Sequence, residues 1–176
     1  MSDKNNTLNL IFPELAHKEK ALAFRQEHFN CGEMVIHGDG GLEGAESYEQ
    51  WIEKINSDLT KDSDGLVPAT TYFAFADDRI VGTIQIRHRL NDYLFSFGGH
   101  IGYGVAPSER RKGYATLMLQ SALEKCANLG IEKVLITCDK NNTASSKTIL
   151  KNGGVMENEI MSDNGEVLQR YWIEIK

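Results

Sequence analysis

The chain has 176 residues, of which 41% are apolar and 25% charged, as is usual for one soluble globular domain with a sizeable core. Its net charge of −6 argues against a general nucleic-acid binder, because neutralising phosphates needs clustered Lys and Arg. The polar N-terminus lacks the apolar stretch of a secretory signal, and no apolar run approaches the roughly 20 residues that span a membrane. We therefore expect neither a nucleic-acid partner nor a membrane.

The three cysteines exclude two common site types. Cys31, Cys126 and Cys138 are odd in number, widely spaced and without a C-x-x-C pair, so neither a disulfide framework nor a zinc site is expected. Cys126 and Cys138 stand among apolar neighbours, where a thiol behaves as a small hydrophobe. This usage favours a reducing cytoplasm and a protein without a metal.

The first part of the chain predicts one short strand and two helices. Residues 8–11 form the strand, which ends at Pro13, and residues 14–30 have helical spacing of apolar side chains. A glycine-rich stretch, residues 38–41, then breaks the chain. Ser47 caps a second predicted helix that reaches about Leu59.

Strands dominate after Pro68. Residues 70–76 and 79–87 are rich in β-branched and aromatic side chains, and Asp77-Asp78 between them is a turn signal, which predicts an antiparallel hairpin. Residues 91–99 are expected to be a loop.

The remaining elements predict the fold class. They are a strand at 100–105, a helix at 113–129 that stops at Gly130, a strand at 133–138, a helix at 142–152, and a hairpin of 155–161 with 166–175. Only residues 100–138 form a clear β-α-β crossover. We therefore predict one α/β domain over residues 1–176, with a mixed, mostly antiparallel sheet, a parallel strand pair at its centre, and flanking helices.

The turn between residues 105 and 113 favours an anion site. The first amides of a helix lack internal partners and carry partial positive charge, so a helix that starts straight after a strand attracts phosphate. Gly113 lets a ligand approach the backbone, and Ala115 is also small. Arg110, Arg111 and Lys112 supply cationic donors. The same residues also fit an ordinary basic loop before a helix.

The run from Ile101 to Ala115 resembles motif A of the GCN5-related N-acetyltransferases (GNAT). The signature of that family, (Gln/Arg)-x-x-Gly-x-(Gly/Ala), is met by Arg110, Gly113 and Ala115. The run from Cys138 to Ser145, with Gly153 further on, is similar to the family's Asn-x-x-(Ala/Ser)…Gly-Phe segment. Gly154 replaces its aromatic residue. Asn142 fits a helix N-cap, either alone or together with a ligand contact.

The resemblance implies acetyl-CoA as co-substrate and a defined way of binding it. Strands 100–105 and 133–138 would splay apart and hold pantetheine between them. The implied contacts are the backbone of Gly104 and Val105, the diphosphate loop of Arg110, Arg111, Lys112, Gly113, Tyr114 and Ala115, and Asn142 and Ser145 along the pantetheine arm.

The resemblance also implies the reaction, an N-acetyl transfer in which a primary amine attacks the thioester directly. A backbone amide near Val105 would stabilise the oxyanion. The tyrosine that many members use as acid is replaced by Ile149, which leaves Tyr171, Tyr103, a water or no acid. His100, at the start of the strand beside the expected cleft, is the candidate base, or else a strand-end histidine with a hydrogen-bonding role.

Several alternatives stay open. The acceptor is a small-molecule or peptide amine, and the donor is acetyl-CoA or a longer acyl-CoA. The loss of the usual tyrosine leaves room for an acetyl-CoA-binding regulatory module without turnover. Residues 87–89 form a basic cluster that either holds an acidic group of the acceptor or is simply solvated. Domains of this kind often pair, so a homodimer is possible.

Overall fold

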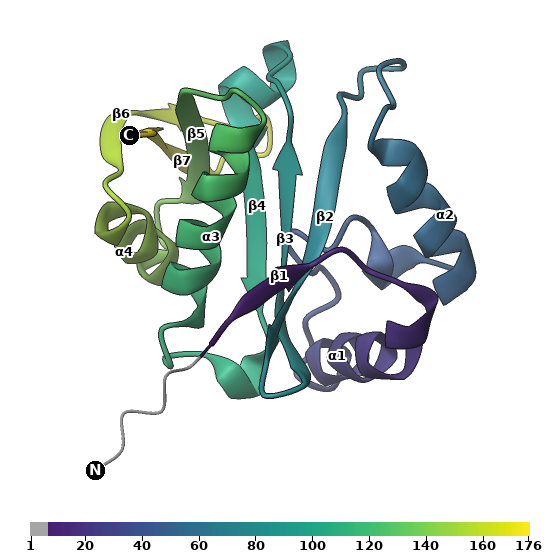
Figure 1. Cartoon of the computed structure of the whole chain (residues 1–176). Helices are drawn as coiled ribbons and strands as arrows, with labels where there is room; N and C mark the ends of the chain where they lie inside the picture. The colour runs from purple at the N-terminus through teal and green to yellow at the C-terminus, as the bar shows by residue number, and fades with distance from the viewer. Residues whose placement is uncertain (1–6) are drawn as a thin grey trace.

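The computed structural model describes residues 7–176 and contains the elements in the predicted order (Figure 1). The helices are α1 (Lys18–Asn30), α2 (Tyr48–Asp58), α3 (Tyr114–Asn128) and α4 (Thr143–Lys151). The strands are β1 (Asn9–Ile11), β2 (Ala69–Ala76), β3 (Arg79–Arg87), β4 (Ile101–Val105), β5 (Lys133–Asp139), β6 (Val155–Met161) and β7 (Val167–Glu174).

The strands form two sheets, β1-β2-β3-β4 and β5-β7-β6. Every ladder within residues 7–176 is antiparallel. β4 and β5 are joined through the crossover helix α3 and face each other across the gap between the sheets (Figure 1). Next to β4, the backbone N–H of His100 donates to the Leu135 carbonyl at 2.7 Å, but no ladder continues from there. The α/β fold with its splayed central pair is confirmed, although the two strands separate two sheets instead of completing one mixed sheet.

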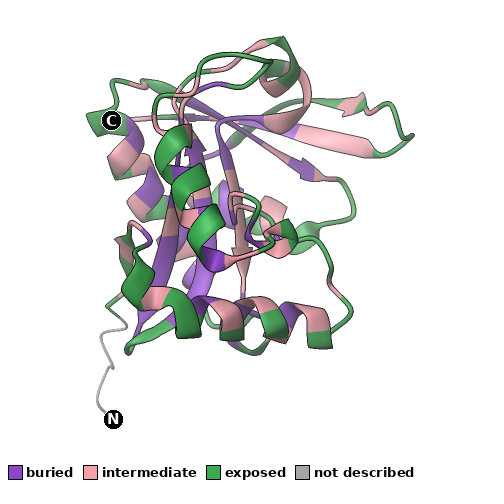
Figure 2. Ribbon diagram, turned by 90° about the vertical axis from the view of Figure 1, so that its right-hand side faces the viewer, coloured by how far each residue is buried: buried purple, intermediate pink, exposed green. Residues whose placement is uncertain are grey.

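Alternation along β2 supplies both faces of the first sheet with apolar side chains. Phe73 and Phe75 pack with α1 and α2, whereas Ala74 and Ala76 pack with α3. Figure 2 shows the buried strands between helices whose outer surfaces are exposed. The core on the α3 side also takes in β5 and β7, so it connects the two sheets across the splay.

Local signals in the sequence account for most of the element boundaries. Asp77 and Asp78 both have positive φ, as a tight hairpin between right-twisted strands requires. Ser47 caps α2 by accepting from Gln50 N, and Gly130 ends α3 with φ of 76°. The segment 91–99, which was expected to be a loop, contains one helical element. Residues 94–98 form a helical turn, and the side chain of Asn91 caps it by accepting from Leu94 N.

Candidate active site

A cleft of about 920 Å³ lies between β4, the start of α3 and α4. The residues predicted to hold the cofactor come together there: Gly104, Val105, Arg110, Arg111, Gly113, Tyr114, Ala115, Asn142 and Ser145 all line it. Lys112 is not among the lining residues. The opposite wall comes from the segment after α1 and includes Glu33, Met34, Val35 and His37.

The loop at the start of α3 presents backbone amides to this cleft. Arg111 and Gly113 have φ of 62° and 84°, so two residues of the loop are left-handed, a backbone conformation that recurs in anion-binding turns. Gly113 is the N-cap of α3 and has no side chain to bond the first helical amides. A Cβ on Gly113 would meet no atom within 4 Å, so its φ and its place in the cleft, not packing, favour glycine. Free amides at a helix start are groups that suit an anion.

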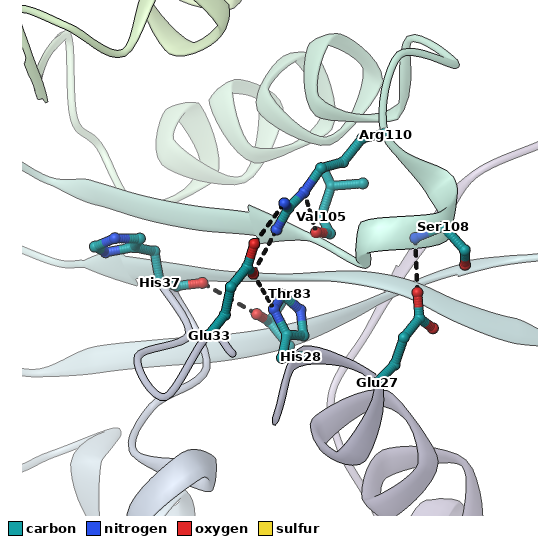
Figure 3. Close-up of polar contacts among 8 residues, drawn as sticks. All are labelled: Glu27, His28, Glu33, His37, Thr83, Val105, Ser108 and Arg110. Carbon is teal, nitrogen blue, oxygen red and sulfur yellow. Dashed lines mark hydrogen bonds and ion pairs between the residues drawn. The ribbon is translucent and has the colours of Figure 1, made fainter. Parts of the chain in front are cut away.

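Two of the three cationic side chains of the loop, Arg110 and Lys112, have partners within the protein. Both terminal nitrogens of Arg110 bond the carboxylate of Glu33, at 2.6 and 2.7 Å, and its Nε donates to the Val105 carbonyl at 3.2 Å (Figure 3). Lys112 pairs with Glu109 at 2.9 Å. Of the three predicted phosphate donors, Arg111 is the one that lines the cleft without an ion pair to a described residue.

Glu33 joins this network from the segment that follows α1, and no motif in the sequence predicts its part in the cleft. Its carboxylate also lies 2.9 Å from His28 Nδ1. The Arg110 hydrogen bonds, against the opposing effect of burial, lower the pKa of Glu33 to about 2. Glu33 and Arg110 are 77 positions apart and share no motif. The ion pair ties one wall of the cleft to the loop that opens α3.

The same segment lies directly on the face of β4 opposite α3. A Cβ on Gly38 would stand 2.3 Å from the Gly102 carbonyl oxygen, and one on Gly104 would stand 2.9 Å from that of His37. Thr83 Oγ1 donates to the His37 carbonyl at 3.1 Å. The glycines of β4 thus let this segment approach, which places the exposed His37 on the cleft wall. The sequence did not predict a role for His37, because the residue stands in an irregular stretch without a motif.

Asp39 anchors the continuation of that segment. Its carboxylate is buried and accepts from Gly41 N at 2.8 Å and Glu43 N at 2.7 Å, while its carbonyl accepts from Trp51 Nε1 at 3.0 Å. Burial, assisted by the Glu43 carboxylate, raises the pKa of Asp39 to about 8.

Tyr103 and Ser145 meet across the cleft. The Tyr103 hydroxyl, on β4, lies 2.7 Å from Ser145 Oγ, on α4. Burial raises the pKa of Tyr103 to about 12, so the phenol keeps its proton at neutral pH. Asn142 accepts from Ser145 N at 3.1 Å, which confirms the N-cap, and it also lines the cleft.

The two residues predicted for acid–base catalysis lie outside the cleft lining. His100 is 6% exposed, and its Nδ1 accepts from Leu135 N at 3.0 Å. Burial, with help from the Arg87 cation, lowers its pKa to about 4. Tyr171 is buried in the core between the sheets, and its hydroxyl donates to Gln169 Oε1 at 2.8 Å. Ile149, at the position of the family's usual tyrosine, is fully buried in that core.

No group of three or more His, Cys, Asp or Glu side chains in residues 7–176 is placed to hold a metal ion. No helix in that range is both long and apolar enough to cross a membrane.

Comparison with known proteins places these features in a family. The sequence model described as "Acetyltransferase (GNAT) family" matches residues 40–153, a range that includes β4, the loop, α3, β5 and α4. No curated protein matches the chain.

Solved structures share the fold over almost the whole chain. One is a ribosomal L7/L12 alpha-N-protein acetyltransferase with coenzyme A disulfide-bonded to one of its cysteines, at TM-score 0.71 and 18% identity over 97% of this chain and 96% of that one. The microcin C7 self-immunity acetyltransferase, in complex with acetyl-CoA and AMP, has TM-score 0.69 and 19% identity, covering 97% and 94%. A dodecameric spermidine N-acetyltransferase from Vibrio cholerae has TM-score 0.66 and 17% identity, covering 97% and 95%.

Proposed function

Because the chain belongs to the GNAT family of acetyl-CoA-dependent N-acetyltransferases, we propose that it acetylates a primary amine of a small molecule or peptide by direct attack, with residues 1–176 acting as one catalytic domain. The observation that carries this proposal is the cleft that opens between β4 and α4 at the uncapped start of α3. Segments outside the family match also contribute, because Glu33 and His37 complete the cleft wall.

The residues present fit acetyl-CoA, which supplies an activated thioester. The diphosphate suits the amides of residues 111–115, where two left-handed residues and a helix start converge. Pantetheine amides suit the edge of β4 that faces β5, because no β4–β5 ladder occupies that edge. Asn142 and Ser145 stand on the far wall.

Tyr103 is the better candidate for the acid that protonates the departing thiolate. Its hydroxyl lies in the cleft and is bonded to Ser145, whereas that of Tyr171 lies in the core and is bonded to Gln169. The raised pKa of Tyr103 keeps its proton available.

His37 replaces His100 as the candidate base. A general base needs a free lone pair within reach of the amine. The Nδ1 lone pair of His100 is used by Leu135 N, and its pKa of about 4 makes it a poor proton acceptor at neutral pH. His37 is exposed on the cleft wall beside Gly104.

The backbone of β4 supplies the proposed oxyanion donor. Ala106 N donates to the Val81 carbonyl of β3. Successive amides of a strand point in opposite directions, so the N–H of Val105 is directed away from β3 toward the cleft. This amide is fixed before substrate binds, as electrostatic stabilisation of a developing negative charge requires.

Release of the CoA thiol from acetyl-CoA, measured against a panel of amines, tests the function. The panel includes spermidine, free amino acids and short peptides with a free N-terminus, since the solved neighbours act on unlike amines. We expect at least one amine to accelerate release, and mass spectrometry to find it N-acetylated. Saturable acetyl-CoA binding without release across the panel would instead support a regulatory module. A parallel assay with longer acyl-CoAs identifies the donor.

Self-association is proposed through the edge strand β6. Val155, Met156 and Met161 are 69%, 48% and 69% exposed, and β6 pairs with β7 alone among the described strands. The dodecameric spermidine N-acetyltransferase is an example of a protein with this fold that forms oligomers. Light scattering should give at least twice the monomer mass, and Val155→Glu with Met161→Glu should reduce it. A monomer at micromolar concentration would contradict the proposal. We further propose that the protein works in the cytoplasm, where its three free thiols would stay reduced.

A further inference from the structure

Arg87, the last residue of β3, is the one member of the basic cluster 87–89 that lacks a side-chain partner among the described residues. Arg89 pairs with Asp62, and His88 Nε2 lies 2.7 Å from Thr70 Oγ1. Arg87 instead donates from one terminal nitrogen to the carbonyls of Gly98 and Gly99, at 3.1 and 3.3 Å.

No carboxylate in the described part of the chain compensates the charge of Arg87. No carboxylate of residues 7–176 lies within ion-pair distance of its guanidinium. Its Nε and second terminal nitrogen have no hydrogen-bond partner in that range, and neither is sealed from solvent. Burial of this half-buried side chain lowers its pKa from the usual range, and the side chain that opposes this effect is Tyr93. Keeping a cation partly out of water without a counter-charge is unfavourable.

The guanidinium lies on the face of β4 opposite α3, which we call the acceptor face. Pairing of Gln85 with Gly102 and of Thr83 with Gly104 places the odd-numbered side chains of β3 on the face opposite α3. A Cβ on Gly102 would stand 3.6 Å from the unpartnered terminal nitrogen of Arg87 and 3.7 Å from Gly38 N. Arg87 therefore lies between the segment that carries His37 and the Gly98–Gly99 turn, one residue along β4 from Tyr103.

The face of β4 that bears Tyr103 and Val105 packs against the core shared with α3 and borders the proposed acetyl-CoA site. On the other face, residues 37 and 38 cover Gly104 and Gly102, and Arg87 lies beside them with part of its guanidinium open to solvent. An amine that approaches from this other side meets the segment 37–38 and Arg87.

We propose that Arg87 binds a carboxylate of the acceptor, so that the substrate is an amine that carries an anionic group and not a polyamine. This assignment rests on the proposed function and names the acceptor class of that site. The fixed carbonyl bonds hold the guanidinium in place, and its free edge offers two N–H groups in the geometry that suits a carboxylate. A polycation such as spermidine would be repelled by the same group.

Matched acceptor pairs that differ only in charge test the proposal. Glycine, β-alanine and γ-aminobutyrate are compared with their amides, and a Ser-Asp-Ala-Ala peptide with Ser-Asn-Ala-Ala, which separates free amino acids from acidic peptides. The carboxylate member of at least one pair should have kcat/KM about tenfold or more above its neutral partner. Ratios near one in every pair, or spermidine as the best acceptor, would overturn the proposal.

Variants locate the effect at Arg87. Arg87→Gln should bring the ratio close to one while the KM for acetyl-CoA stays unchanged, and Arg87→Lys should keep part of the preference. Arg89→Gln, which removes a neighbouring cation already paired with Asp62, should leave the ratio as in wild type. A preference that survives Arg87→Gln would place the anion site elsewhere.

A binding measurement separates this inference from the proposed function. If no amine releases thiol, the same pairs are titrated into CoA-saturated protein by calorimetry. Tighter binding of the carboxylate member, lost in Arg87→Gln, supports the anion site although transfer has failed. Equal affinities within every pair contradict it.

Discussion

The two faces of β4 are built on different principles. On the α3 and α4 side, the cleft offers amides of a helix start and a strand edge, and left-handed Arg111 and Gly113 shape the loop. On the opposite face, distant segments are brought together by side chains, as in the Glu33–Arg110 and Thr83–His37 contacts. The backbone face suits a ligand that every family member shares, whereas the side-chain face can vary with the acceptor.

Gly113→Glu is the most severe test of the backbone face. The new carboxylate would stand against the diphosphate, so acetyl-CoA affinity should fall by at least about hundredfold while the fold persists. Calorimetric titration measures the affinity. Gly165→Glu is the matched control, because Gly165 has the same φ of 84°, equally open surroundings and a place in the β6–β7 turn. Wild-type affinity in the first variant would remove the loop from the site.

Tyr103→Phe tests whether the hydroxyl on the α3 and α4 side of β4 is the acid that protonates the departing thiolate. Loss of the hydroxyl should lower kcat about tenfold or more and leave the KM for acetyl-CoA nearly unchanged. Tyr171→Phe, which removes a core hydroxyl bonded to Gln169, should keep the wild-type kcat. Equal kcat values for Tyr103→Phe and wild type would mean that the thiolate leaves without help from this residue.

His100→Ala tests the joint between the sheets. Leu135 N would lose its acceptor, so the free energy of unfolding should fall by about 1–3 kcal/mol, while the pH–rate profile keeps its shape. The pKa of His100 is lowered from 6.5 to about 4, so between these pH values the unfolded chain binds a proton at His100 that the folded protein does not. Wild type should therefore lose stability as pH falls through this window, and the variant should lose less. Unchanged stability with an altered pH–rate profile would restore His100 as base.

Glu43→Gln should give the smallest effect, on the anchor of the acceptor face. The raised pKa of Asp39 means that the folded state keeps a proton that the unfolded chain has lost, so stability falls as pH rises from 3.8 toward about 8. Without the Glu43 carboxylate, the free energy of unfolding that is lost across this pH range should shrink by about 1 kcal/mol or less. Denaturant titrations at several pH values measure it. Glu46→Gln, exposed in the same segment, should leave the slope intact.

The sequence predicted the backbone face well because its determinants are local. The loop from Arg110 to Ala115 and the cap at Asn142 follow directly from neighbouring residues, and the structure brings them into one cleft. Lys112 is the exception, since it pairs with Glu109 and is not among the residues that line the cleft.

The side-chain face could not be predicted, because each of its contacts joins distant positions. Nothing near Glu33 indicates that it pairs with Arg110, and His37 stands in an irregular stretch. The role expected of His100 depended on its place in the chain, but the direction of its ring is set by Leu135 on another strand. Side-chain direction at a strand end depends on tertiary packing, which periodicity does not report.

The Glu33–Arg110 ion pair connects the proposed acetyl-CoA site with the proposed acceptor site. Arg110 belongs to the loop proposed to bind the diphosphate, and Glu33 to the segment that continues onto the face of β4 opposite α3. If acetyl-CoA binding changes the affinity for the acceptor through this pair, the acceptor must change the affinity for acetyl-CoA by the same factor, because linkage is reciprocal. Removing the pair with Glu33→Gln would then remove both effects together.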